Sequence, residues 1–166
     1  VELDNFVGLV IDRLEAAGVL DNTIITISPD HYAYMMDEEV YSAYVGAPTG
    51  DKEFYRQDFL IYNPNMVPQV REKTVSIVDV VPTILNLLDS SVEFKYYTGI
   101  DMFESGDNYV FFPDYSVTDG ANYLYLDGTY KGEESQRAAL EQALVEKIVL
   151  YEMQEGMYAT DYFKKD

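Results

Sequence analysis

The 166-residue sequence predicts an α/β fold with a few mainly parallel strands, helices against them, a small antiparallel sheet and a C-terminal helix. Two observations predict this class. An amphipathic helix leads into an apolar, β-branched strand without alternation, which is typical of a parallel strand buried on both faces. Further along, short aromatic strands end in an Asp-Gly pair, which favours a hairpin turn.

The first predicted helix covers residues 3–17. Its apolar side chains recur at helical spacing on one face, and they are Leu3, Phe6, Val7, Val10 and Leu14. Gly18 is a stop signal, because glycine adopts the left-handed backbone of a helix end without a steric penalty. Residues 19–22 form a turn, and residues 23–28 (TIITIS) form the buried strand. Helix, tight turn and buried strand together favour a parallel sheet.

The middle of the chain predicts a loop, strands and a short helix. Residues 37–50 are acidic, rich in tyrosine and punctuated by Gly and Pro, so they predict a loop. Further strands are expected at residues 59–62, which Asn-Pro-Asn follows, and at residues 75–78. Asp79 is placed to cap a helix that runs to Leu88, with Pro82 in the first turn, where a missing N–H costs little.

The C-terminal part predicts the antiparallel sheet and the last helix. Short strands are expected at residues 109–112, 115–118 and 123–126, and Asp127-Gly128 then signals a hairpin turn. A helix is expected over residues 134–151, with an apolar stripe of Leu140, Leu144, Ile148 and Tyr151. We therefore expect a core in residues 1–105, and the small sheet and last helix in residues 106–166.

Composition excludes several classes of function. The chain has 11 Lys and Arg against 30 Asp and Glu, a net charge of −19. Such a surface repels phosphate backbones and anionic lipid, so no nucleic-acid partner is expected. The same charge has an ordinary explanation, which is solubility. No cysteine is present, which excludes disulfides, thiolate metal sites and a cysteine nucleophile. The chain begins with Val1 and shows neither a signal peptide nor a membrane span, so we expect a fragment or a processed product.

Asp30 and His31 are the main candidates for chemistry. His31 is the only histidine, and the pair directly follows the predicted strand at residues 23–28, where open α/β sheets bind their ligands. Imidazole and carboxylate together suit Mn, Zn or Fe, and Mg less well. A surface histidine beside a solvated aspartate would have the same sequence. Moreover, zinc-type sites take three or four protein ligands, so the pair is at most part of a site.

Other candidates carry weaker signals. Tyr41, Tyr44 and Tyr55 suit a loop that contacts sugar or lipid, although tyrosine is also ordinary half-buried material. Arg56 suits a phosphate or sulfate contact, or a pair with a nearby acid. The acidic run at residues 37–39 lacks the alternating ligand spacing of a calcium loop, which favours a solvated charge run.

The order of these segments resembles the C-terminal half of the alkaline phosphatase and sulfatase superfamily, closest to the lipoteichoic acid synthase branch. The matching segments are residues 3–8 (LDNFVG), 20–23 (LDNT), 30–32 (DHY), 56–62, 78–87 (VDVVPTILNL) and 99–103 (GIDMF). The set covers about residues 3–163 in order and is thin between residues 38 and 53. Pro29 and Ala33 stand where the family usually has glycine, which leaves the loop geometry open.

The resemblance implies a metal site and a covalent mechanism. Asp30 and His31 match the family's metal ligands, while an acidic ligand and a nucleophilic Thr or Ser come from earlier in the chain, so no catalytic nucleophile is expected here. The expected cofactor is a divalent metal, manganese first, with magnesium, calcium and zinc as alternatives. A metal-activated hydroxyl would attack phosphorus or sulfur and form a covalent ester intermediate. The phospho or sulfo group of that intermediate would then pass to an alcohol or to water.

The resemblance further implies a fragment of a membrane-anchored transferase at the extracytoplasmic face of the cell membrane. It would move glycerol phosphate from a lipid to a cell-surface glycolipid or polymer. A sulfatase, a phosphoethanolamine transferase or a non-catalytic module that binds a glycan or a partner are the alternatives. Expected partners are the missing N-terminal half and a lipid-linked phosphate or sulfate ester. We also expect the isolated fragment to be inactive and to self-associate through the surface left uncovered.

Overall fold

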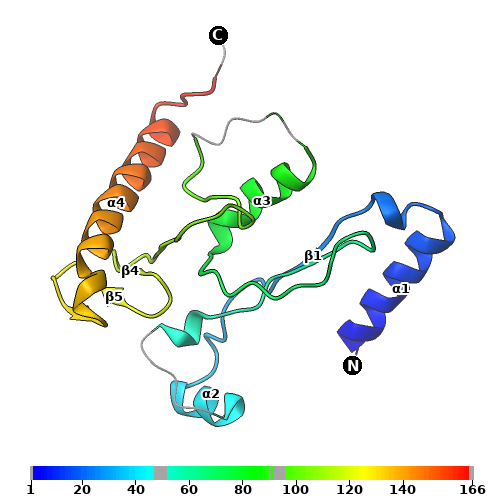
Figure 1. Ribbon diagram of the computed structural model, residues 1–166, viewed down its shortest axis with the longest axis horizontal. Coiled ribbons are helices and arrows are strands. Elements are labelled where there is room, and N and C mark those ends of the chain that lie inside the picture. The colour runs from blue at the N-terminus through cyan, green and yellow to red at the C-terminus, as the bar shows by residue number, and fades with distance from the viewer. Residues whose placement is uncertain (1, 47–51, 90, 92–95, 165–166) are drawn as a thin grey trace. The chain divides into compact units, whose positions relative to one another are not determined.

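The computed structural model describes residues 2–46, 52–89, 91 and 96–164. They fall into two compact units, Val1–Gln69 and Val70–Asp166. Helices and strands occur in both, which confirms the α/β class and the presence of a small antiparallel sheet and a C-terminal helix (Figure 1). The expected boundary after residue 105 falls inside the second unit and stays a prediction.

The first unit opens with helix α1, Glu2–Ala16, as the periodicity predicted. Gly18 has φ +69° and ends the helix. Its N–H bonds to the Glu15 carbonyl at 2.8 Å, and the Val19 N–H bonds to the Leu14 carbonyl at 3.1 Å, which satisfies two of the helix's last carbonyls. No residue of α1 is buried, and the side chain of Phe6 on its apolar face is 61% exposed. A short 3₁₀ turn, Leu20–Asn22, leads to the first strand.

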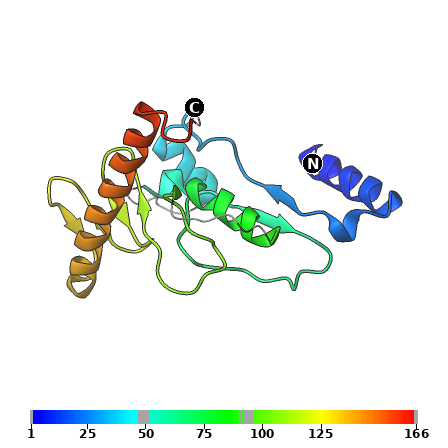
Figure 2. The same ribbon diagram turned by 90° about the horizontal axis from the view of Figure 1, so that it is seen from above.

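Strand β1, Ile25–Ile27, pairs with β2, Leu60–Tyr62, in an antiparallel ladder (Figure 2). The Asn63 side chain clamps the pair, since its Nδ2 donates to the carbonyls of Thr23 at 2.8 Å and Asp21 at 3.2 Å. The mainly parallel sheet that we expected is not formed by the described residues, because both of their sheets are antiparallel. The expectation of burial on both faces is also wrong, because Thr26, whose side chain points to the opposite face from Ile25 and Ile27, is exposed.

Helix α2, Glu38–Val45, corrects the prediction of a loop over residues 37–50, of which residues 47–50 lie outside the described part. Glu38 lies in its first turn, where a negative charge complements the positive end of the helix dipole. Gly46, at φ +77°, ends it by donating its N–H to the Ser42 carbonyl at 3.0 Å. A 3₁₀ turn, Glu53–Tyr55, precedes β2.

The second unit is built around a buried carboxylate. Residues 75–78 form no strand, and a 3₁₀ turn, Ile77–Asp79, leads instead into helix α3, Val80–Leu87. Asp79 is 1% exposed and does not cap α3 with its side chain as we expected. Its carboxylate accepts hydrogen bonds from the N–H groups of Ser76 and Ile100, both at 2.8 Å, and from Asn108 Nδ2 at 3.1 Å. These bonds tie the start of α3 to the segments around residues 100 and 108.

The predicted antiparallel sheet is confirmed. Its strands, in the order β3-β4-β5-β6, are β3 Val110–Phe111, β4 Val117–Thr118, β5 Tyr123–Leu124 and β6 Tyr130–Lys131. The Asp-Gly turn joins β5 to β6, with Gly128 at φ +84° and its N–H bonded to the Tyr125 carbonyl at 3.0 Å.

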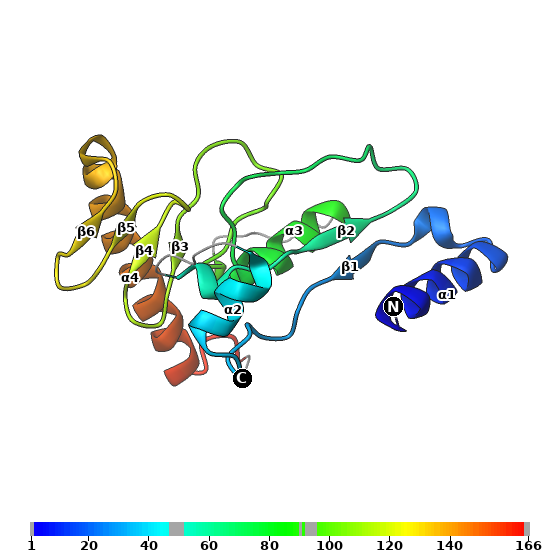
Figure 3. The same ribbon diagram turned by 90° about the horizontal axis from the view of Figure 1, so that it is seen from below.

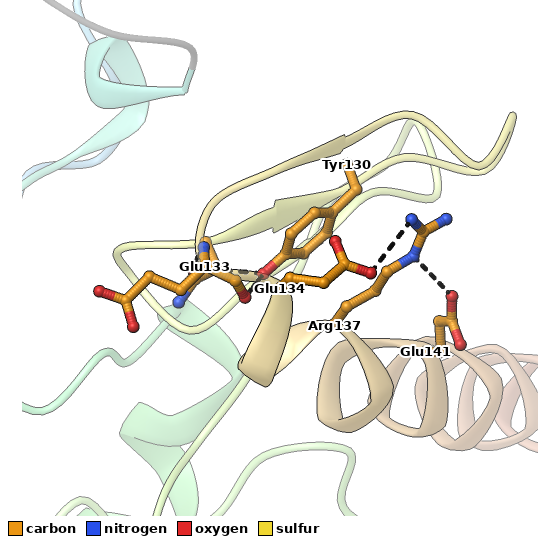
Figure 4. Close-up of polar contacts among 6 residues, drawn as sticks. Tyr130, Glu133, Glu134, Arg137 and Glu141 are labelled. Atoms are coloured by element: carbon orange, nitrogen blue, oxygen red, sulfur yellow. Dashed lines mark hydrogen bonds and ion pairs between the residues drawn. The ribbon is translucent and has the colours of Figure 1, made fainter.

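Helix α4, Arg137–Ala159, packs on β4 and β5, and extends beyond the predicted end at residue 151 (Figure 3). The buried cluster between them consists of Val117, Leu124, Leu140 and Ala143. Polar contacts fix the start of the helix (Figure 4). The Tyr130 hydroxyl donates to the Glu133 carbonyl at 2.5 Å, and Arg137 Nε donates to Glu141 Oε1 at 3.0 Å.

Candidate functional site

The two predicted ligands lie in the loop that follows β1. The strand ends at Ile27, and Asp30 and His31 follow after two residues. Both are open to solvent, with side chains 89% and 51% exposed respectively. The pair therefore lies beyond the carboxyl end of this strand, where the sequence placed it, and is open to solvent.

The two side chains converge. His31 Nε2 lies 3.5 Å from Asp30 Oδ1, and His31 Nδ1 lies 2.8 Å from the Tyr32 carbonyl oxygen. A carbonyl can only accept, so Nδ1 carries the proton, and in the neutral ring the Nε2 lone pair is left on the side of the aspartate. Two ligand atoms that are each about 2.1 Å from one ion, at about a tetrahedral angle, lie about 3.4 Å apart. The observed separation therefore fits two neighbouring ligands of one divalent cation.

Aromatic contacts hold the loop in place. The His31 ring meets the edge of Tyr34 with centroids 4.5 Å apart. The Tyr32 ring contacts Tyr55 at 4.6 Å and Phe54 at 5.5 Å, so the 3₁₀ turn before β2 supports the residue next to the histidine. Each such pair contributes about 0.5–1.5 kcal/mol beyond the area that it buries. The ring contacts therefore link the histidine loop to the 3₁₀ turn before β2.

A hollow of about 300 Å³ opens beside the histidine. It is lined by Pro29, His31, Tyr32, Ala33, Tyr41, Phe54, Arg56 and Gln57. Pro29 and Ala33, which depart from the glycines of the resembled motif, thus form part of its wall. Arg56 brings a positive charge to the same hollow, in a chain whose net charge is −19.

The remaining candidates divide into those near the pair and those apart from it. Tyr41 lines the hollow and Tyr55 supports Tyr32, whereas the Tyr44 side chain is 82% exposed and does not line it. Phe54 and Gln57 line the hollow but were not predicted from the sequence. Their position on either side of the Tyr55-Arg56 pair was the one available signal, because the hollow depends on α2, which was expected to be a loop.

A closed metal site is not present in the described part of the chain. None of its residues form a group of three or more His, Asp or Glu side chains able to hold an ion. The acidic run at residues 37–39 precedes and begins α2, which supports the solvated charge run rather than a calcium loop. Asp30 and His31 therefore remain two predicted ligands. None of the described helices is long and apolar enough to span a lipid bilayer.

A comparison with protein-family models identifies the family. A family model described as Sulfatase matches residues 1–90, which is more than half of the chain and includes the Asp30-His31 loop and α3. No curated protein matches the chain.

Proposed function

The chain belongs to the sulfatase family, and on that premise we propose that it is part of a metal-dependent transferase that moves phosphoglycerol, or a related phospho group, onto a cell-surface glycolipid or polymer. Family membership supports a sulfatase-superfamily enzyme as the parent protein. The single observation that carries the proposal is the approach of His31 Nε2 to Asp30 Oδ1, beside a hollow that Arg56 also lines.

Asp30 and His31 are the proposed metal ligands, with Mn²⁺ as the preferred ion. One carboxylate oxygen and one imidazole nitrogen suit manganese, while magnesium, calcium and zinc are the alternatives. A divalent cation held here would stabilise negative charge on a phosphate or sulfate oxygen. The Tyr32 carbonyl supports the site, because it accepts the hydrogen bond from Nδ1–H and so leaves the lone pair of Nε2 to bind the metal.

We place the nucleophile and the other ligands in a preceding segment of the same protein. Two ligands are fewer than the three or four protein ligands of zinc-type sites, and the resembled family takes the others from earlier in its chain. The proposed location of the parent is the extracytoplasmic face of the cell membrane, where a lipid-linked ester is available. On this proposal the 166-residue chain alone binds metal weakly and has no catalytic activity.

A sulfuric ester hydrolase is the second candidate, and the description of the matching family model favours it. The resemblance of the motif order to the lipoteichoic acid synthase branch favours the phosphotransferase. Both use the same ligands and differ in whether water or an alcohol accepts the group, so Asp30 and His31 do not separate them.

Calorimetric titration with Mn²⁺ tests the ligands. The full 166-residue chain is compared with Asp30→Ala and His31→Ala, and with Asp12→Ala on the exposed part of α1 as the control. We expect weak binding that falls at least about tenfold in either ligand variant, because each removes half of the donors that the chain supplies. Binding that is unchanged in both variants, or equally reduced in the control, would refute the assignment.

The reaction is tested on the longer protein that contains this chain, assayed with Mn²⁺. A fluorescent phosphatidylglycerol and an aryl sulfate are offered separately. Glycerol phosphate transfer that Asp30→Ala abolishes supports the transferase, whereas aryl sulfate hydrolysis with the same dependence supports the second candidate. The 166-residue chain is assayed beside it on p-nitrophenyl phosphate and sulfate, and turnover above background would show that it contains a nucleophile.

A further inference from the structure

Strand β1 has an open edge. It pairs with β2 on one side, and no other strand in the described part of the chain pairs with it. An edge strand presents a row of backbone N–H and C=O groups that can pair with another chain. The run that contains β1, residues 23–28 (TIITIS), has no charge, proline or glycine and is rich in β-branched residues. Such a composition favours pairing between strands of different chains.

The sequence of β1 is its own complement in an antiparallel pair. Ile25, Thr26 and Ile27 read the same in both directions. A second copy that lies antiparallel, with Thr26 opposite Thr26, therefore places each Ile25 opposite an Ile27. Side chains alternate between the two faces of a strand, so the isoleucines share one face and the threonines the other. A Thr–Thr cross-strand pair is favourable, and the pairing has the two-fold symmetry of most dimers of identical chains.

Charge distinguishes this edge from the uncovered apolar face of α1, which is another surface on which a second copy could lie. The charged residues of α1 are four acids and one base, namely Glu2, Asp4, Asp12, Glu15 and Arg13. Two such helices face to face would bring like charges together. Residues 23–28 carry no charge, although the net charge of the chain is −19. Asp21 and Asp30 lie just outside this run, and salt screens their repulsion, because the Debye length is about 8 Å at physiological ionic strength.

We propose that two copies of this chain pair through the open edges of β1, antiparallel about Thr26, and form one four-stranded sheet in the order β2-β1-β1-β2. The isoleucines of both copies then lie side by side on the face that Leu60 and Tyr62 share, since these are their partners in β2. The contact is small, so the dimer is weak and reversible. It uses neither the candidate metal ligands nor the hollow, and is therefore independent of the proposed function.

Sedimentation velocity of the full 166-residue chain, over a range of protein concentrations, tests the dimer. We expect a monomer–dimer equilibrium that strengthens from low to physiological salt, because salt screens the repulsion between two chains of charge −19. Thr26→Lys sets two like charges opposite each other and should weaken the dimer at least about tenfold. Position 26 is exposed, so the variant should fold. Ser105→Lys, at an exposed position of the second unit, adds the same charge and should leave the dimer unchanged.

Single cysteines test the register, since the chain has none of its own. Thr26→Cys places two thiols directly opposite each other, within the distance that a disulfide spans. Ser28→Cys places them about 14 Å apart along the strands, too far for a disulfide. We expect oxidation to link Thr26→Cys at least about tenfold faster than Ser28→Cys. Strands that pair in parallel and in register would instead link both variants.

Several results would overturn the proposal. A chain that is monomeric at every concentration in physiological salt would do so, as would a dimer that Thr26→Lys and Ser105→Lys weaken equally. A dimer that Phe6→Lys weakens more than Thr26→Lys would assign the contact to α1 instead. Equal rates of disulfide formation in the two cysteine variants would exclude the antiparallel register. Circular dichroism verifies that each variant is folded.

Discussion

Two aspartates of this acid-rich chain occupy opposite environments. Asp79, in the second unit, is 1% exposed, and its carboxylate accepts three hydrogen bonds from the protein. The Asp30 side chain, in the first unit, is 89% exposed, and its neighbour is the His31 imidazole. Asp79 lies in the longest matched segment, where the sequence predicted a helix cap, and Asp30 lies in the predicted metal motif.

The two aspartates differ in which groups bind their carboxylate oxygens. A buried carboxylate whose lone pairs are used by N–H donors stabilises the fold and has little capacity left for a ligand. Its charge also acts on Lys147 of α4: burial lowers the pKa of that ammonium, and the negative charges of Asp79 and Glu146 oppose the effect. An exposed carboxylate beside an imidazole nitrogen can instead accept a cation. The comparison therefore assigns Asp79 to stability and Asp30 to binding.

The sharpest test removes each carboxylate in turn. Asp79→Ala leaves the N–H groups of Ser76 and Ile100 and the amide of Asn108 without their buried acceptor, so we expect a loss of about 4 kcal/mol in the free energy of unfolding. Asp30→Ala is the matched control and should change that free energy by less than about 0.5 kcal/mol. Urea denaturation measures both. A loss below about 1 kcal/mol for Asp79→Ala would contradict the structural role.

Substitutions of two glycines extend the comparison to the backbone. Gly99 precedes Ile100, whose N–H binds Asp79, and a Cβ at this glycine would clash with the carbonyl of Val78. We expect Gly99→Ala to lower the free energy of unfolding by about 3 kcal/mol, because backbone cannot yield as a flexible side chain does.

Gly156 is the matched control for that substitution. It lies within α4, and a Cβ there would have no neighbour within 4 Å. Gly156→Ala should therefore stabilise the chain by about 0.5–1 kcal/mol, since alanine favours the helix. Thermal unfolding of both variants measures the contrast, and equal effects would show that the close approach at Gly99 has no energetic weight.

Local patterns predicted much of the fold. The periodicity of residues 3–17, the stop at Gly18 and the Asp127-Gly128 hairpin are determined by neighbours along the chain, and all three are present. The errors came from features that depend on distant residues. The direction of β1 relative to β2 is set by pairing across more than thirty positions, and an apolar strand of three residues gives no signal for it. Helix α2 was not predicted, because its sequence is rich in aromatic and acidic residues.

The candidate site divides in the same way. The position of Asp30 and His31 after a strand follows from the order of residues, and the structure has it. The hollow does not follow from that order, because Tyr41 reaches it from α2 and Phe54 from a turn before β2. Adjacent motif residues can be recognised along a chain, whereas a binding surface assembled from three segments requires the fold.

An aspartate of intermediate burial provides the last and smallest test of the comparison. Asp119 Oδ1 accepts the N–H groups of Ala121 at 2.9 Å and Asn122 at 2.7 Å, and its Oδ2 accepts the Asn122 side-chain amide at 2.8 Å. Burial by itself raises the pKa of Asp119, but these hydrogen bonds to the charged form outweigh it and hold the pKa below the ordinary value of 3.8.

A lowered pKa means that between the folded and ordinary values the unfolded chain binds more protons, so stability rises with pH through that window. The stabilisation from Asp119 is therefore complete above the ordinary value of 3.8 and is lost as the pH falls through the lower, folded pKa. Asp119→Asn has no proton to bind there. We expect it to be less stable than the parent chain at pH 7, with a difference smaller than that for Asp79→Ala, and we expect the gap to narrow as the pH falls below 3.8. Asp127, whose pKa is also lowered, by the Thr129 N–H, is present in both proteins and cancels in the comparison. Urea denaturation between pH 7 and pH 3 measures the gap, and a gap of constant size would show that the Asp119 hydrogen bonds do not favour its charged form.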